Sequence, residues 1–261
     1  MTLAPALFVS HGSPMFALEP GLLGPNLQAL GRELDGARAI VVVSPHWQTR
    51  GVRVTGTAAP GTIHDFGGFP QPLYALRYQP PGDPALAVDI TGLLQAAGFD
   101  ARVDPGRGLD HGAWVPLRYL RADADIPVVQ VSLPIDADAA TALRLGEALA
   151  PLRARGVVVV ASGSLTHNLY EFGRGVRDPD YAQEFADWVA DAVARRDVDA
   201  LLDYRARAPH AARAHPTEEH FLPLLVALGA SGDAEPGTLV RGGMTHGVLS
   251  MDSFAFGRKA A

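Results

Sequence analysis

The chain has 261 residues, of which 48% are hydrophobic and 19% are charged, and its formal net charge is −6. This size and apolar content allow one large hydrophobic core or two small ones. The acidic balance argues against nucleic acid and anionic membranes as partners, because both attract a basic surface. No apolar stretch is long enough for a membrane span. We therefore expect a cytoplasmic protein.

The sequence contains no cysteine. Disulfides, thiolate metal sites and cysteine nucleophiles are therefore excluded together. A bound metal would have to use His, Asp, Glu or water as ligands, and such nitrogen and oxygen donors suit Fe(II), Zn, Mn or Ni better than soft ions.

Short apolar runs alternate along the chain with segments of helical periodicity. Strands are predicted over residues 6–10, 39–44, 52–55, 101–103, 128–133, 157–162, 238–241 and 248–256. Helices are predicted over residues 26–34, 84–97, 139–155, 181–196 and 217–228. Several of the strands are nearly continuous β-branched or apolar runs, which is typical of parallel strands buried on both faces.

The alternation of strands and helices predicts an α/β fold, with a mainly parallel central sheet flanked by helices on both faces. The sequence shows no internal repeat and no linker, so we expect residues 1–261 to form a single domain. The longest irregular stretch, 56–84, is rich in Gly and Pro and carries His64, Phe66 and Phe69. Loops of this length inside a compact domain are usually either functional or disordered. We expect it to be a binding loop.

Three histidines follow predicted buried strands: His11 in ALFVSHGSP, His46 in AIVVVSPHW and His167 in VVVVASGSLTHN. In open α/β sheets, ligands bind just beyond the carboxyl ends of the strands, so residues far apart in sequence can meet at one edge. Imidazole is the commonest side-chain metal ligand and carries protons near neutral pH. The pattern predicts a metal-dependent enzyme with its site at the C-terminal ends of the strands.

Three further histidines stand in loops or near a predicted helix start: His111 in LDHGAW, His220 in PTEEHFLP and His64 in TIHDFGGFP. Each of these three histidines could instead have a purely structural role, because helix starts and turns favour the same residue types that surround them here. Acidic residues before His220, for example, are ordinary complements of a helix dipole. His220 on the inner face of its predicted helix could nevertheless supply a third ligand.

Six segments taken together resemble the class III extradiol ring-cleavage dioxygenases, in the 4,5-DOPA dioxygenase-type branch related to the protocatechuate 4,5-dioxygenase β subunit. These segments are LFVSHGSP, IVVVSPHW, TIHDFGGFP, LDHGAW, ASGSLTHN and PTEEHFLPL. The resemblance extends from about residue 5 to residue 255. It implies a non-haem metal site, usually with Fe(II), and with Zn(II) often found in isolated members.

The motif match implies a role for each histidine. His11 and His46 would be the two metal ligands at the strand exits, and His220 would complete the site. His167 would be the acid/base histidine, close enough to touch the metal itself. His111 would be a second histidine that handles protons.

The sequence leaves two candidates for the third metal ligand, an imidazole and a carboxylate. The wider class uses two His and one Glu, and here Glu218 and Glu219 directly precede His220. We favour His220, because the DOPA-type branch has a histidine at this place.

The resemblance further implies a small aromatic diol and O2 as reactants, with both oxygen atoms inserted as the ring opens. His64, Trp47 and Phe66 would form the substrate pocket. The alternatives are a zinc-dependent hydrolase on the same scaffold, a binding protein without catalysis, and histidines with purely structural roles. A homodimer is the commonest assembly for such a chain.

Overall fold

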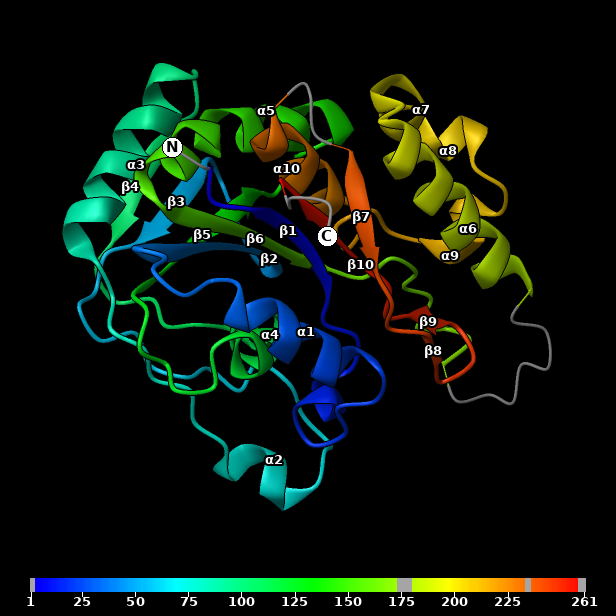
Figure 1. The fold of residues 1–261 in the computed structure, drawn as a ribbon, viewed down its shortest axis with the longest axis horizontal. Helices are drawn as coiled ribbons and strands as arrows, with labels where there is room; N and C mark the ends of the chain where they lie inside the picture. The colour runs from blue at the N-terminus through cyan, green and yellow to red at the C-terminus, as the bar shows by residue number, and fades with distance from the viewer. Residues whose placement is uncertain (1–2, 173–179, 233–235, 258–261) are drawn as a thin grey trace.

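The computed structural model describes residues 3–172, 180–232 and 236–257. In these ranges eight strands form a central sheet in the order β4-β3-β5-β2-β6-β1-β10-β7 (Figure 1). Their bounds are β1 Ala6–Ser10, β2 Ala39–Thr49, β3 Val52–Thr55, β4 Ala101–Asp104, β5 Val128–Pro134, β6 Val157–Gly163, β7 Gly237–Val240 and β10 Ser253–Phe256. A separate hairpin is formed by β8 (Met244–Thr245) and β9 (Leu249–Ser250).

The centre of the sheet is parallel. Parallel pairs link the neighbouring strands in the series β5, β2, β6 and β1, and a further parallel pair joins β3 to β4. The pairing is antiparallel between β3 and β5, between β1 and β10, and between β10 and β7. The predicted α/β class with a mainly parallel sheet is therefore confirmed. Because these parallel strands point the same way, their carboxyl ends lie along one edge of the sheet.

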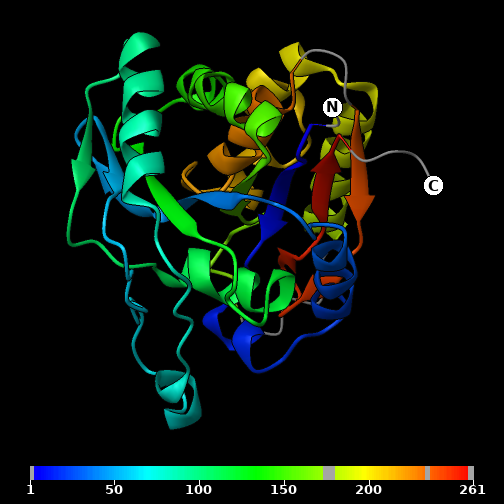
Figure 2. The same ribbon diagram turned by 60° about the vertical axis from the view of Figure 1, so that its left-hand side comes forward.

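Helices cover both faces of the sheet (Figures 1 and 2). One face carries α3 (Pro84–Ala96), α5 (Ala139–Leu149) and α10 (Leu222–Ser231), and the other carries α1 (Leu23–Arg32) and α4 (His111–Leu120). Alternate residues of β1 and β2 enter separate cores on the two faces, which explains why these strands are apolar without interruption.

Shorter elements surround this framework. Helices α6 (Asp180–Arg195), α7 (Val198–Leu202), α8 (Tyr204–Arg207) and α9 (Ala211–Ala214) stand beyond the β7 edge (Figure 1). The short α2 (Gln71–Ala75) lies on a loop that projects from the body in both views (Figure 2). The 3-10 helices are η1 (Pro14–Ala17) and η2 (Ala150–Arg155).

Aspartates begin four of the described helices. The side chains of Asp83, Asp110, Asp138 and Asp197 accept hydrogen bonds from backbone N–H groups in the first turns of α3, α4, α5 and α7. Such caps satisfy N–H groups that have no partner within the helix. The cap at Asp110 matters for the site, because it makes His111 the first residue of α4.

Several predicted elements differ from the structure. The helix predicted over 139–155, for example, is α-helical only to Leu149 and continues as the 3-10 helix η2. The single strand predicted over 248–256 is divided into β9 and β10, because the Asp252 side chain accepts the N–H groups of Gly242 and Gly243 and holds a bend between them. The helix predicted from residue 217 begins only at Leu222. The turn before it is tied instead to the end of β6, where the carbonyl of His220 accepts the N–H of Ser164 at 3.0 Å.

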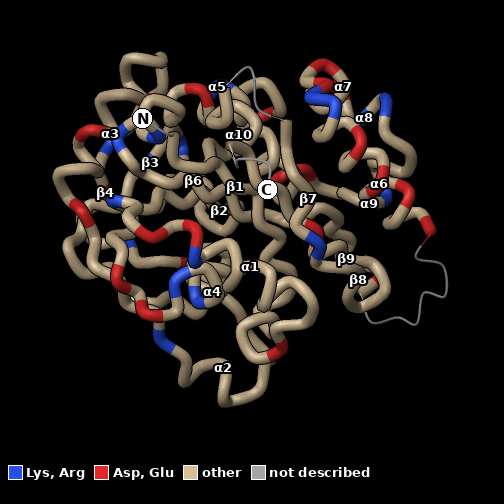
Figure 3. The backbone as a smooth tube through the Cα atoms, in the orientation of Figure 1, with Lys and Arg blue, Asp and Glu red and all other residues tan. Residues whose placement is uncertain are grey.

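Charged side chains lie mainly on the outer helices and loops, and β1, β2 and β6 carry none (Figure 3). Among the helices of the described residues, none has both the length and the apolar character needed to cross a lipid bilayer.

Candidate metal centre

His11 leaves the end of β1 and is buried. Its Nδ1 lies 2.9 Å from the hydroxyl oxygen of Ser162 on β6. The Ser162 hydroxyl donates its own hydrogen to the carbonyl of Gly112 at 2.5 Å. Ser162 must therefore accept from His11, which places the ring hydrogen on Nδ1 and leaves the lone pair on Nε2.

His46 is presented by a bulge. The register of β2 against β5 shifts between Ser44 and Gln48, so residues 45–47 stand outside the parallel ladder. Bulges commonly re-aim a side chain near a functional site, and here the Nε2 of His46 lies 3.1 Å from the Nε2 of His11. The strand does not end at Ser44 as predicted; it resumes after the bulge.

His220 lies in the turn before α10, and its ring approaches the rings of His11 and His46. Its Nε2 lies 3.4 Å from the Nε2 of His46. Its Nδ1 donates to Oε1 of Glu219 at 3.0 Å, and the hydroxyl of Thr217 donates to the same oxygen at 3.0 Å. His167 stacks on the His220 ring, with centroids 3.5 Å apart and an interplanar angle of 8°.

His111 reaches the same place from the first turn of α4. Its ring centroid lies 3.9 Å from that of His46, and its Nδ1 lies 3.0 Å from Oδ2 of Asp65 on the long loop. The described residues thus form two adjoining groups in which the possible ligand atoms all lie within 4.8 Å of one another. These groups are His11, His46 and His111, and His167, Glu219 and His220.

The histidines of the centre resist protonation. Burial, assisted by the neighbouring imidazoles, holds the pKa of His11 and of His220 well below its usual value. Burial likewise lowers the pKa of His46 to about 3 and that of His167 to about 4. At neutral pH these rings are therefore uncharged, and each has one nitrogen whose lone pair can bind a metal. This donor set fits a divalent metal ion.

Two aspartates hold His111 and the start of α4 in place. Burial alone would raise the pKa of Asp65, but the hydrogen bonds from His111 outweigh it and lower that pKa. Asp110 is fully buried, and burial, with the nearby charge of Asp65, raises its pKa. Its carboxyl accepts a 2.5 Å hydrogen bond from the Gln130 amide, which fixes the start of α4 against β5.

A cavity of about 350 Å³ opens beside the histidines, within the usual size range of small-molecule sites. One end is formed by imidazoles and the rest mostly by apolar side chains. The lining residues are Gly12, Ser13, Pro14, His46, Phe66, Phe69, His111, His167, Leu169, Phe172, His220 and Leu249.

The three residues predicted to bind substrate occupy different positions. Phe66 lines the cavity, with its ring centroid 5.6 Å from that of His111. Trp47 is outside the lining, and its ring lies under the Arg107 guanidinium at 5.1 Å. His64 is also outside the lining, with its ring 5.6 Å from Trp114.

The sequence did not predict the contacts of several site residues. Glu219 was considered as a metal ligand and not as the partner of the His220 ring, and the bond between Asp65 and His111 was not foreseen, although each carboxylate adjoins a histidine in sequence. Ser162, Leu169 and Leu249 carried no signal in the sequence. Leu249 reaches the cavity because β9 lies beside the segment that follows β6, where the N–H of Ser250 donates to the Thr166 hydroxyl. No local pattern predicts such a contact.

The imidazoles gather at the carboxyl edge of a mostly parallel sheet, beside a partly aromatic cavity. This combination is typical of a metal-dependent α/β enzyme. Residues 5–250 match the family described as the catalytic LigB subunit of aromatic ring-opening dioxygenase, and the chain belongs to this family. It is a metal-dependent extradiol dioxygenase, as the resemblance of its motifs implied.

The similarity to known proteins extends over nearly the whole chain. A 4,5-DOPA dioxygenase extradiol of Escherichia coli K12 is 42% identical over 98% of this chain and 96% of its own. One of Beta vulgaris is 38% identical over 95% of each chain. The crystal structure of an uncharacterized protein of Escherichia coli K12 superposes with a TM-score of 0.81 at 37% identity, covering 97% of this chain and 99% of that one.

Proposed function

We propose that this centre holds Fe(II) on His11, His46 and His220, and opens the ring of a catechol with O2. The observation that carries the proposal is the convergence of three Nε2 atoms, separated by 3.1 and 3.4 Å along the series His11, His46, His220. We assign the third ligand to the imidazole of His220, because its Nε2 faces the other two Nε2 atoms and its Nδ1 is oriented by the carboxylate of Glu219.

Iron rather than zinc is proposed because the reaction is a redox one. Imidazole donors accept either metal, and zinc has no redox chemistry. When bound, Fe(II) supplies the redox and Lewis-acid chemistry by which a diol and O2 can react.

The remaining histidines handle protons. His167 faces the cavity from its stack on His220 and is unprotonated at neutral pH, so it can accept a hydroxyl proton as the diol binds. His111 faces the same cavity with Asp65 on its Nδ1, an arrangement suited to returning a proton later in the reaction. Proton transfer by a positioned side chain is worth about 10²–10⁴ in rate.

The overall reaction balances without another reductant. A carbon–carbon bond beside the diol breaks, and both atoms of O2 enter the product, which carries a carboxylate and a semialdehyde carbonyl. The catechol itself supplies the electrons that reduce the dioxygen. The apolar wall, including Phe66 and Phe69, holds the ring and excludes water from it.

The test is oxygen consumption by protein loaded with Fe(II) under anaerobic conditions and then mixed with a catechol and isotopically labelled O2. We expect one O2 consumed per catechol, a yellow semialdehyde product, and both labelled atoms in it. Zinc-loaded protein should show none of this. Full iron occupancy with no cleavage of any catechol would contradict the proposal.

A further inference from the structure

Gly112 is the second residue of α4 and is buried. Its φ lies outside the left-handed region, so the backbone at this position would accept any L-amino acid. Alanine is the better residue inside a helix, because glycine loses more conformational freedom on folding. The glycine is therefore explained neither by the backbone conformation nor by the helix.

Close packing against the bulge of β2 does explain it. A Cβ atom at Gly112 would lie 2.9 Å from Cδ2 of the His46 ring and closer still to Oγ of Ser44. Non-bonded heavy atoms pack best at about 3.5–4.0 Å, so both atoms lie too close for a methyl group. The Ser44 hydroxyl in turn accepts the backbone N–H of His46 at 3.3 Å. Both contacts therefore bear on the position of His46.

The carbonyl of Gly112 is linked to the other histidine at a strand exit. It accepts the hydrogen of the Ser162 hydroxyl at 2.5 Å, and that hydroxyl accepts from Nδ1 of His11 at 2.9 Å. One residue of α4 is thus packed against His46 by its missing side chain and connected to His11 through a single hydroxyl group.

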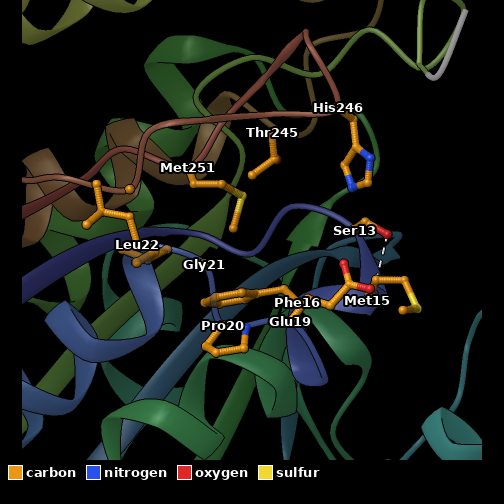
Figure 4. A pocket seen from close by; sticks show the side chains of 12 residues that line it. Ser13, Met15, Phe16, Glu19, Pro20, Gly21, Leu22, Thr245, His246 and Met251 are labelled. Carbon is orange, nitrogen blue, oxygen red and sulfur yellow. Dashed lines mark hydrogen bonds between the residues drawn. The ribbon is translucent and has the colours of Figure 1, made fainter.

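The glycine that follows His11 has different surroundings. A Cβ atom at Gly12 would meet only the thioether end of Met251. Met251 lines a small hollow of about 50 Å³ (Figure 4), so this flexible end has room to move aside. The φ of 57° at Gly12 lies in the left-handed region and by itself favours glycine. Of these two glycines, Gly112 is the one whose missing side chain leaves room for a metal-site histidine.

We propose that Gly112 is a positioning residue of the metal centre. Its missing side chain lets α4 pack directly on the bulge of β2 and so sets the position of the His46 ring, and its carbonyl sets the tautomer of His11 through Ser162. The inference rests on the proposed function, in which His11 and His46 are metal ligands. The same packing brings the ring of His111, the preceding residue, to a centroid distance of 3.9 Å from that of His46.

The first experiment measures how tightly Gly112→Ala binds Zn(II) and Fe(II), by competition with a chelator of known affinity. We expect the affinity to fall by about 10–100-fold, the usual effect of disturbing the groups that orient a metal ligand, with the helix content by circular dichroism unchanged. Gly92→Ala is the matched control, because Gly92 also lies inside a helix, α3, and a Cβ atom there has no neighbour from another element within 4 Å. It should bind metal as the parent protein does.

Ser162→Ala tests the carbonyl of Gly112 separately and does not depend on whether Gly112→Ala folds. It removes the hydroxyl that orients His11, and we expect a loss of metal affinity of about 10–100-fold. Ser164→Ala is its control, because Ser164 is also buried and its hydroxyl has no hydrogen-bond partner among the described residues.

The double variant that combines Gly112→Ala with Ser44→Ala tests the packing itself. It lacks the oxygen nearest to the new methyl group, and part of the lost affinity should return. No recovery, together with unchanged affinity in Ser162→Ala, would overturn the positioning role.

The visible spectrum of the cobalt(II)-loaded protein reports the arrangement of the ligands, which a loss of stability alone would not change. It should differ from the parent spectrum in Gly112→Ala and match it in Gly92→Ala. Parent affinity together with the parent spectrum in Gly112→Ala would overturn the positioning role and leave ring cleavage intact. Parent protein that binds iron and cleaves no catechol would instead contradict the proposed function, and the measured affinities would still decide the role of Gly112.

Discussion

The carboxylate of Asp65 holds His111 by two bonds at once. Its Oδ1 accepts the backbone N–H of His111 at 2.8 Å, and its Oδ2 accepts the ring Nδ1–H at 3.0 Å, although the two residues are 46 positions apart. The pair joins the long loop to the first turn of α4. The loop is therefore part of the site, as its composition indicated, and it positions an imidazole as well as an aromatic wall.

Replacing Asp65 by Asn should separate proton transfer from metal binding. An amide can donate to Nδ1 and so favour the wrong tautomer of His111, and we expect kcat to fall by about 10²-fold or more with the metal content unchanged. Metal per chain and kcat are measured on the same preparation. Asp35→Asn, an exposed partner of Arg121, is the control. Loss of metal in Asp65→Asn would show that His111 is a ligand instead.

His11→Ala and His46→Ala should each lose most of the bound metal and all ring cleavage, because each removes one of the converging Nε2 atoms. Metal analysis after dialysis against Fe(II) measures the loss. His210→Ala provides the comparison, since His210 is an exposed partner of Glu184. If the two site variants were less stable but kept their metal, the histidines would be structural.

Glu219→Gln should weaken metal binding by about 10–100-fold, the usual effect of removing a partner that orients a metal-bound histidine. The carboxylate fixes the His220 tautomer through the 3.0 Å bond to Nδ1. Competition with a coloured chelator gives the affinity. Glu218→Gln tests the neighbouring carboxylate, which accepts instead from the hydroxyl of Tyr204, and should bind metal normally. Equal affinities in the two variants would argue against the orienting role.

The stability of the metal-free protein should fall as the pH falls. Burial lowers the pKa of His215 from 6.5 to about 3, so between these values the unfolded chain binds a proton that the folded chain does not. Stability is therefore fully present above pH 6.5 and is lost progressively toward pH 3. In His215→Gln, which can keep the donor to the Leu165 carbonyl, the melting temperature should depend less steeply on pH. The same slope as in the parent protein would exclude this histidine as a source.

The sequence alone determined the framework of this protein. Apolar runs such as β1, β5 and β6 were recognised with nearly correct bounds, because a strand buried on both faces requires continuous apolar residues over a short window. The same logic placed His11 and His167 beyond buried strands. The motifs around these histidines were specific enough to indicate the family that the comparison with known proteins then showed.

Only the tertiary structure decided how the side chains of the site are oriented. Three features illustrate this: the bulge that aims His46, the bond between Glu219 and the His220 ring, and the two bonds from His111 to Asp65. Each depends on contacts between segments distant in sequence or on local backbone geometry. Periodicity reports whether a residue is buried, because burial follows from the element it belongs to. It does not report which partner a ring nitrogen meets, because that depends on how separate elements pack.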